Sequence, residues 1–278
     1  MTTIIQTRKT NLDHDTAYKD EGRNTVKTII SAQGLSKRYT LGKDNYVDAL
    51  RGADLEIQAG EMVAIMGPSG CGKSTLMHVI GCLDSPDTGN VLLDGQRVDN
   101  LRSRGTTALL RSSIGFIFQG FNLIPTLSSL DNVALAAQYA GRSRREAQKL
   151  AMEALDMVDL ADRAGHRPTE LSGGQQQRVA IARSLVNKPL VIMGDEPTGN
   201  LDSTSSAEVI AMMRDINVET GTTFVLVTHD PDVAAACDRV VYMKDGSVTH
   251  EDELEKVFRS SGKAWAAERT EDLSPVAA

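Results

Sequence analysis

The chain has 278 residues, of which 41% are hydrophobic and 24% charged, the composition of a globular protein with one large domain or two small ones. A net charge of −7 without a dense run of lysine and arginine argues against nucleic acid as a partner. The three cysteines, Cys71, Cys82 and Cys237, form no C-x-x-C pair and indicate neither a disulfide framework nor a zinc site.

Residues 1–28 are polar and are expected to form an arm. They also lack the apolar stretch that a secretory signal requires. Apolar and acidic residues alternate in 53–57, which predicts a strand with one wet face. Residues 62–66 are apolar throughout, as in a parallel strand buried on both sides, and a glycine-rich turn and a helix over 74–82 follow. No apolar run approaches the roughly 18 residues of a membrane span, so we expect a cytosolic chain.

The middle of the chain predicts a helical insertion. An apolar segment at 91–93 ends in a turn at 94–95, and 114–118 reads as another short strand. From about 128 to 160 the pattern is helical: the run from Ser143 to Glu146 fits a capping box, and apolar residues then recur at three- and four-residue steps.

Strands and helices alternate again after the insertion. A helix over 175–186 is stopped by Pro189, and a buried strand (190–193), a helix (203–218) and two strands (223–228 and 239–244) follow. The tail beyond about 261 contains Trp265, and we expect a short terminal helix packed on the body there rather than a membrane anchor.

The strongest motif runs from Gly67 to Ser74 and matches G-x-x-x-x-G-K-[ST] between a buried strand and a helix. Its glycines let backbone N–H groups point at phosphates, and the helix adds its positive N-terminal end. Lys73 supplies a charge for the β- and γ-phosphates, and the Ser74 hydroxyl reaches magnesium. A dinucleotide-binding turn does not fit, because Thr75 stands where the third glycine belongs.

Two acids, Asp195 and Glu196, follow the buried strand at 190–193. At a strand end beside the phosphate loop, Asp195 is placed to coordinate magnesium and Glu196 to accept a proton from the attacking water. Taken alone, the two acids would also suit a solvated turn.

A second helix start of the anion-binding kind lies at Ser172-Gly173-Gly174. Ser172 is an N-cap residue by type, and the glycines free the backbone where the helix begins. A plain helix cap would explain the serine but not the two glycines followed by the run from Gln175 to Arg178.

Together these motifs resemble the nucleotide-binding subunit of an ATP-binding cassette (ABC) transporter, and Leu171 to Gln175 matches that family's signature. The resemblance covers about residues 30–250 and implies an α/β fold: a P-loop NTPase core of mostly parallel sheet flanked by helices, an N-terminal antiparallel β-subdomain and an inserted helical subdomain. The implied division is an arm (1–28), an ATP-binding domain (29–260, with the helical insertion at about 120–186) and a tail (261–278).

The resemblance also implies roles for residues that have a plainer alternative. Tyr39 would stack on adenine, or be an ordinary strand aromatic. Gln119 would reach magnesium and the attacking water, or be a polar residue at a strand end. Asp202 would lie in the loop that crosses a dimer interface, or cap a helix. His229 would contact the γ-phosphate, or be a loop histidine.

The implied site therefore has four parts. The catalytic residues are Glu196, His229 and Gln119. The ATP-binding residues are Tyr39, Gly67, Pro68, Ser69, Gly70, Cys71, Gly72, Lys73, Ser74 and Thr75. The signature, acting on the partner's ATP, is Ser172, Gly173, Gly174 and Gln175, with Asp202 at the dimer interface. The magnesium ligands are Ser74, Gln119 and Asp195.

Within the family, the segments 81–84, 115–119, 166–171, 198–202 and 228–231 resemble the macrolide-export and lipoprotein-release branch. Two positions depart from its pattern without removing a catalytic group: Gly194 replaces the small or apolar residue usual before the magnesium aspartate, and Asp131 replaces a glutamate.

The resemblance further implies cofactors and partners. ATP and Mg2+ would bind between two copies arranged head to tail, at the cytoplasmic side of a membrane, under an integral-membrane permease. Residues 119–125 would transmit closure to that permease, with Phe121, Leu123 and Ile124 either exposed to it or packed locally. The alternative function is a non-transporting ABC ATPase that signals across the membrane, as cell-division relatives do. A soluble repair ATPase does not fit the short spacing between Ser74 and Ser172, and a translation ATPase would carry two cassettes in one chain. A small-molecule kinase would have no reason to carry the signature.

Overall fold

The computed structural model describes residues 27–253 apart from 43, 44, 100 and 102. Nearly all of the expected N-terminal arm and the whole C-terminal tail with Trp265 therefore lie outside the described residues. Among the described residues, no helix is both long enough and apolar enough to cross a bilayer.

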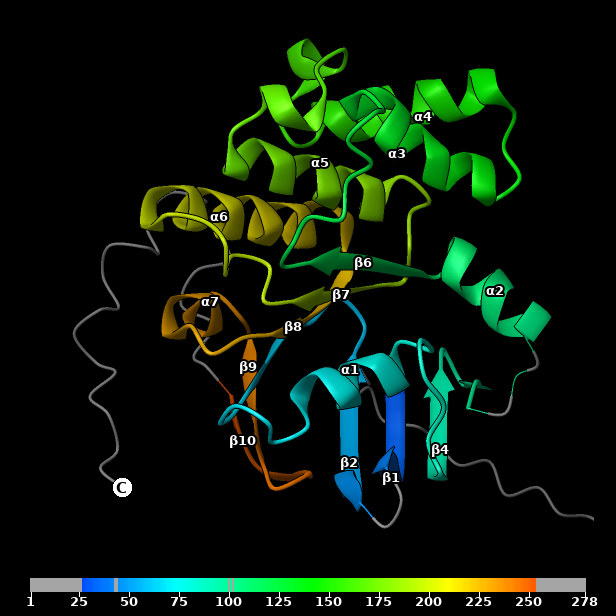
Figure 1. Ribbon diagram of the computed structural model, residues 1–278, viewed down its shortest axis with the longest axis vertical. Coiled ribbons are helices and arrows are strands. Elements are labelled where there is room, and N and C mark those ends of the chain that lie inside the picture. The colour runs from blue at the N-terminus through cyan, green and yellow to red at the C-terminus, as the bar shows by residue number, and fades with distance from the viewer. Residues whose placement is uncertain (1–26, 43–44, 100, 102, 254–278) are drawn as a thin grey trace, which may run out of the picture.

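Two sheets organise the described part of the chain (Figure 1). The smaller is antiparallel, in the order β2-β1-β4-β5, and its strands are β1 (Thr28–Gly42), β2 (Asn45–Gln58), β4 (Thr88–Leu93) and β5 (Gln96–Arg97). The larger has the order β10-β9-β3-β8-β7-β6, and its strands are β3 (Met62–Met66), β6 (Ile114–Phe118), β7 (Val191–Asp195), β8 (Thr223–Val227), β9 (Arg239–Lys244) and β10 (Ser247–Glu253). All of its pairings are parallel except β9 with β10. The predicted α/β class with a mostly parallel sheet is confirmed.

Helices lie on both sides of the parallel sheet (Figure 1). Between β6 and β7 the chain forms three of them, α3 (Ser129–Tyr139), α4 (Arg144–Asp156) and α5 (Gly173–Leu185), which is the predicted helical insertion. Only half of the predicted capping box is present at α4: the Ser143 hydroxyl accepts from the Glu146 N–H, but the Glu146 carboxylate pairs with Arg142 instead of the Ser143 N–H. The remaining helices are α1 (Lys73–Ile80), α2 (Ser103–Ser112), α6 (Ser203–Thr220) and α7 (Pro231–Ala235).

The parallel sheet separates two hydrophobic cores. Because successive side chains of a strand point to opposite faces, Phe224 and Leu226 of β8 pack with the helical insertion and α6, whereas Val225 and Val227 pack with α1 and the antiparallel sheet. Such strands have two buried faces, which explains why 62–66 and 190–193 are apolar throughout.

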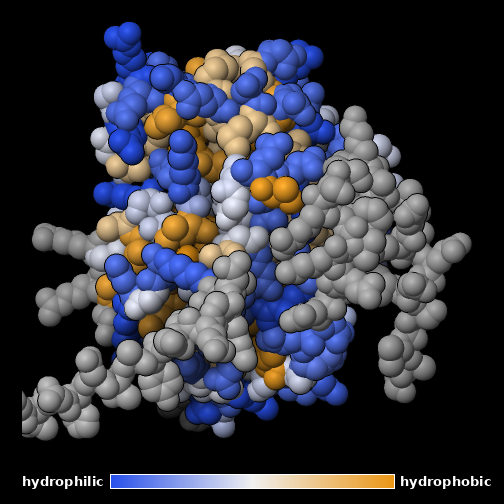
Figure 2. Space-filling model, turned by 180° about the vertical axis from the view of Figure 1, so that it is seen from behind, coloured by the Kyte–Doolittle hydropathy of each residue, from blue (hydrophilic) through white to orange (hydrophobic). Residues whose placement is uncertain are grey.

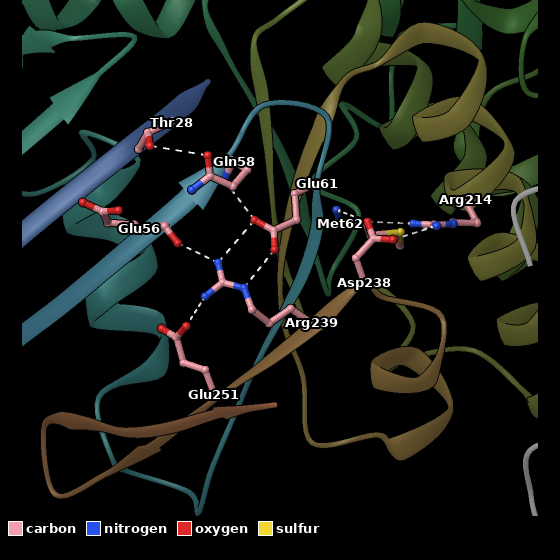
Figure 3. A network of polar contacts seen from close by, with 9 residues as sticks. All are labelled: Thr28, Glu56, Gln58, Glu61, Met62, Arg214, Asp238, Arg239 and Glu251. Atoms are coloured by element: carbon pink, nitrogen blue, oxygen red, sulfur yellow. Dashed lines mark hydrogen bonds and ion pairs between the residues drawn. The ribbon is translucent and has the colours of Figure 1, made fainter. Parts of the chain in front are cut away.

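A polar network joins the two sheets at the edge where the parallel strands begin (Figure 3). Arg239, at the start of β9, donates to both carboxylate oxygens of Glu61, at 2.8 and 3.2 Å, and to the Glu56 carbonyl of β2 at 2.6 Å. It also pairs with Glu251 of β10. Beside it, Asp238 accepts from the Met62 N–H and from Arg214 of α6.

A candidate nucleotide-binding and hydrolysis site

The predicted phosphate-binding and catalytic residues gather at the opposite edge of the parallel sheet, where its strands end. β3 ends before the phosphate loop, β6 before Gln119, β7 at Asp195, and β8 just before Thr228-His229. In open α/β sheets this edge is where ligands bind. One edge thus collects groups from positions 67 to 229 of the chain.

The phosphate loop has a conformation that only glycine tolerates at two positions. Gly67 has φ +149°, and a Cβ there would lie 2.2 Å from the Met243 carbonyl oxygen. Gly72 has φ +106°, and its Cβ would lie 2.3 Å from the Ala49 carbonyl oxygen. Gly72 is also the N-cap of α1 and offers no side-chain cap, so the first N–H groups of this helix remain available to an anion.

The cationic and hydroxyl groups of the loop both have hydrogen-bond partners within the site. The Lys73 ammonium donates to the carbonyls of Gly67 and Pro68, at 2.8 and 3.0 Å, which places its charge inside the loop. The Ser74 hydroxyl donates to Asp195 Oδ1 at 3.1 Å. Residues separated by 121 positions in the chain therefore bring two hard oxygen ligands together.

This oxygen pair fits a magnesium ion. Mg2+ prefers hard oxygen ligands and usually binds through one or two protein groups, with phosphates and waters completing its shell. Among the described residues, no group of three or more His, Cys, Asp or Glu is arranged to hold a metal ion, so no competing all-protein cage is present there.

Glu196 and His229 form a hydrogen-bonded pair beside the phosphate loop. His229 Nδ1 lies 2.8 Å from Glu196 Oε1, and the imidazole is largely exposed whereas the carboxylate is mostly buried. The hydrogen bond to Glu196, helped by its negative charge, raises the pKa of His229. Glu196 adopts φ +47°, an uncommon backbone conformation for a residue with a side chain, and its N–H donates to the Val227 carbonyl.

The unusual Gly194 has a local packing reason. A Cβ at this position would lie 2.7 Å from Leu226 Cδ2, so the Leu226 side chain occupies the space that a residue at 194 would need. Gly194 pairs with Leu226 across β7 and β8.

Gln119 is hydrogen-bonded to Asn200, two positions before Asp202 in the chain. The Gln119 side-chain amide donates to Asn200 Oδ1 at 3.3 Å, and Asn200 Nδ2 donates to the Gln119 carbonyl at 2.9 Å. Asp202 caps α6 and accepts from the N–H and hydroxyl of Ser205, at 2.9 and 2.8 Å. The donation from the Ser205 backbone lowers the pKa of Asp202. The alternative of a helix cap is confirmed for Asp202, and its dimer role remains a prediction.

Tyr39 lies in β1 with its hydroxyl on Asp84. The phenol donates to Asp84 Oδ2 at 2.8 Å, and Lys37 donates to Asp84 Oδ1 at 2.7 Å while its ammonium lies 5.3 Å from the Tyr39 ring centroid. Burial, followed by the hydrogen bond to Asp84, raises the pKa of Tyr39. These contacts orient the ring, and its predicted stacking on adenine stays a prediction.

The signature turn is an exposed helix start. Ser172 caps α5 in a reciprocal capping box: its hydroxyl accepts from the Gln175 N–H at 3.3 Å, and its own N–H donates to the Gln175 side chain at 3.0 Å. This turn begins one of the inserted helices. It is not among the site residues that lie at the ends of the parallel strands.

The loop after Gln119 is held by a residue that the sequence analysis did not single out. Arg183 of α5 donates to the carbonyls of Phe121 and Asn122, at 2.8 and 2.5 Å. Both residues have positive φ, +60° and +50°. Burial lowers the pKa of Arg183. Further along, Leu123 packs against the core and Ile124 is 40% exposed, and contact of this segment with a permease remains a prediction.

Gln177 of α5 is a second residue that the sequence analysis did not single out. It is completely buried and donates to the Pro197 carbonyl at 2.5 Å. The sequence signal was available: Gln177 lies three positions after Gly174 and four before Ile181, on the buried stripe of the helix.

Comparison with known proteins agrees with this geometry. Residues 50–199 match the family described as ABC transporter. The chain is 46% identical over 230 residues to the ABC transporter ATP-binding protein MJ0796 of Methanocaldococcus jannaschii, covering 81% of this chain and 97% of that protein. It is 44% identical over 220 residues to the lipoprotein-releasing system ATP-binding protein LolD of Bacteroides fragilis, covering 79% of this chain and all of LolD.

Two further similarities concern a longer protein and a solved structure. The macrolide export ATP-binding/permease protein MacB of Rhodopirellula baltica is 46% identical over 247 residues, which are 88% of this chain but 36% of MacB. The dimeric post-hydrolysis structure of the MJ0796 cassette, bound to ADP and Pi, superposes with a TM-score of 0.75 at 43% identity, covering 81% of this chain and 99% of the cassette.

The fold and the match to a solved ATP-binding cassette define a P-loop ATPase, whose phosphate loop, Asp195 and Glu196 lie at one edge of the parallel sheet. The chain belongs to the ABC transporter family, as an ATP-binding subunit that hydrolyses ATP.

Proposed function

We propose that this chain acts as a head-to-tail homodimer that hydrolyses Mg-ATP to drive a membrane permease of the macrolide-export or lipoprotein-release type. It would work at the cytoplasmic face of the membrane, attached through that permease. The observation that carries the hydrolytic part is the Ser74–Asp195 contact at 3.1 Å beside the Glu196–His229 pair at 2.8 Å. The branch rests on the similarity to LolD and MacB, whose names state lipoprotein release and macrolide export.

The chain's own residues divide the work as follows. Backbone N–H groups of 67–74 and the Lys73 ammonium bind the phosphates, and the Tyr39 ring supports the adenine. Ser74, Asp195 and Gln119 would hold the magnesium ion, which when bound neutralises charge on the phosphates. Glu196 takes the proton of the attacking water, and His229 holds the Glu196 carboxylate through its ring nitrogen and faces the terminal phosphate.

The Ser172-Gly173-Gly174 turn would complete the site of the partner copy. The positive N-terminal end of a helix stabilises a highly charged phosphate, which a single copy leaves facing solvent. ATP binding then closes the pair, and hydrolysis removes the bridging charge and reopens it.

Three variants test the assignment of these residues. Glu196→Gln should keep ATP binding but lose about 10²- to 10⁴-fold in turnover, the usual share of a general base; near-normal hydrolysis would remove Glu196 from that role. Lys73→Ala should abolish nucleotide binding in a fluorescence assay, and unchanged affinity would contradict the phosphate-loop assignment. Ser172→Arg in the Glu196→Gln background should abolish ATP-dependent dimerisation in size-exclusion chromatography.

The permease and the branch are tested by affinity purification of the chain from detergent-solubilised membranes. A co-purifying integral protein with few membrane helices and a large extracytoplasmic domain supports the branch. The alternative, an ABC ATPase that signals across the membrane without moving a substrate, predicts the same partner binding but no ATP-dependent substrate movement after reconstitution in vesicles.

A further inference from the structure

The loop that carries Glu196 is built on an unusual backbone. Glu196 has φ +47°, its N–H donates to Val227 at 2.9 Å, and its carbonyl accepts from the Gly199 N–H at 3.0 Å. The next residue is Pro197, which has no N–H and anchors the loop only through its ring and its carbonyl. A hydrogen bond to the Pro197 carbonyl is therefore a further restraint on the backbone that carries Glu196, beside the bonds that Glu196 itself makes.

The group that holds it is the side chain of Gln177. This residue is completely buried in α5, and its amide N–H donates to the Pro197 carbonyl at 2.5 Å. Two neighbours of Gln177 on the same helix also pack against the chain that follows Pro197: a Cβ on Gly173 would lie 3.4 Å from Leu201, and one on Gly174 would lie 3.2 Å from Ser205. The start of α5 and the Glu196 loop are thus packed together. Among these contacts, the Gln177–Pro197 hydrogen bond lies nearest to Glu196 along the chain.

Packing alone does not account for a glutamine here. The Gln177 Oε1 atom is buried and has no hydrogen-bond partner among the described residues. An unpaired buried acceptor is unfavourable, and a methionine would fill a similar volume without leaving such an acceptor. What glutamine supplies and methionine lacks is the N–H group that fixes the Pro197 carbonyl.

We propose that Gln177 is a positioning residue for hydrolysis, which holds the Glu196 loop in its catalytic conformation from the helix that carries the Ser172 turn. This inference rests on the proposed role of Glu196 as general base. Gln177 touches neither phosphate nor water, and it acts through the backbone on either side of Pro197. A displacement of about 1 Å in a catalytic group costs on the order of 10²-fold in rate.

The test compares Gln177→Met with the matched control Gln176→Met. Gln176 is the adjacent glutamine of α5, and its side chain donates to the Leu171 carbonyl at its own helix start. We expect Gln177→Met to fold with an unchanged Tm, to bind a fluorescent ATP analogue with wild-type affinity and to lose about 10²-fold in kcat. In the Glu196→Gln background it should still dimerise with ATP, because closure uses the phosphate loop and the Ser172 turn. Gln176→Met should keep wild-type kcat.

A loss of kcat without a loss of ATP affinity or dimerisation distinguishes a positioning role of Gln177 from a purely structural one. An unchanged kcat in Gln177→Met overturns the inference, and so does a joint loss of kcat, ATP affinity and dimerisation, which would mean that Gln177 merely supports α5. Gln177→Asn keeps the amide but is one methylene too short to reach Pro197, so it should reproduce the kcat loss; wild-type turnover by this variant also overturns the inference. Failure of the proposed function looks different, because Glu196→Gln itself would then retain its turnover.

Discussion

Replacing Arg239 should lower the free energy of unfolding more than replacing most other buried residues. Its side chain and that of its partner Glu61 are only 10% and 14% exposed, and two hydrogen bonds join them. Removing one partner of a buried ion pair costs about 3–5 kcal/mol, since the other charge is left uncompensated. Glu61 would still accept from the Gln58 N–H at 2.9 Å, so the lower end, about 3 kcal/mol, is expected for Arg239→Met.

Thermal unfolding followed by circular dichroism measures this loss. A domain of roughly this size loses about 2–4 °C in Tm per kcal/mol, so Arg239→Met should unfold about 6–12 °C lower. Glu251→Gln is the control within the same network. Glu251 is 37% exposed, and exposed ion pairs contribute only about 0–1 kcal/mol.

The sign of the coupling tests the reasoning more sharply than the size of the loss. If an uncompensated Glu61 charge is the main cost, Glu61→Gln combined with Arg239→Met should unfold at a higher temperature than Arg239→Met alone, because the neutral amide still accepts from Gln58. A double variant as unstable as the sum of the single losses would refute this account of the network.

Three further predictions concern the nucleotide site. Glu196→Gln should lower the pKa of His229 toward its ordinary value in an NMR titration, because the hydrogen bond to Glu196 raises this pKa. The stabilisation from the pair is complete below the ordinary histidine pKa and is lost as pH rises through the raised value. An unchanged titration midpoint of His229 would contradict the pairing. Arg183→Met should speed hydrogen exchange of the amides in 120–124, because it removes both hydrogen bonds to the loop carbonyls. Arg183→Lys should restore protection only in part, since one ammonium does not reproduce the two donors of a planar guanidinium. Equal exchange in the wild-type protein and both variants would show that other contacts hold the loop. Gly70→Ala, whose Cβ meets nothing within 4 Å, should cost about 1–2 kcal/mol for its positive φ alone. Gly72→Ala has the same kind of backbone cost and also a clash with the Ala49 carbonyl, so it should cost about 1–3 kcal/mol more than Gly70→Ala, and equal losses in chemical denaturation would argue against the clash.

Much of the fold could be predicted from local pattern. The runs at 62–66 and 191–193 lie in strands with two buried faces, and their continuous apolar character reveals this directly, whereas Leu190 lies before the strand and is 41% exposed. The helix after position 202 was predicted to begin at Ser203 and does so, since Asp202 is a strong N-cap residue.

The helix α2 could not be predicted in the same way. Its sequence contains Gly105, Thr106 and Thr107, residues with poor helix propensity. The helix forms because Leu109 and Leu110 pack against the core next to α1, which is a tertiary contact invisible in a local window.

In the site, motif spacing identified the groups at the strand ends but not the residues that hold them. Gln177 and Arg183 act on backbone carbonyls, at Pro197 and at Phe121 and Asn122. A carbonyl acceptor exists at every residue, so no pairing of side-chain types marks such a contact in the sequence. Only the three-dimensional arrangement selects which carbonyl is used.

The packing of Gly194 against Leu226 has a consequence for protein engineering. A segment from a relative that carries a larger residue at position 194 would force the Leu226 side chain to shift, because Leu226 Cδ2 already fills that volume. A smaller residue at 226 would relieve this contact, so the strand before the two acids and the strand before His229 are best exchanged together.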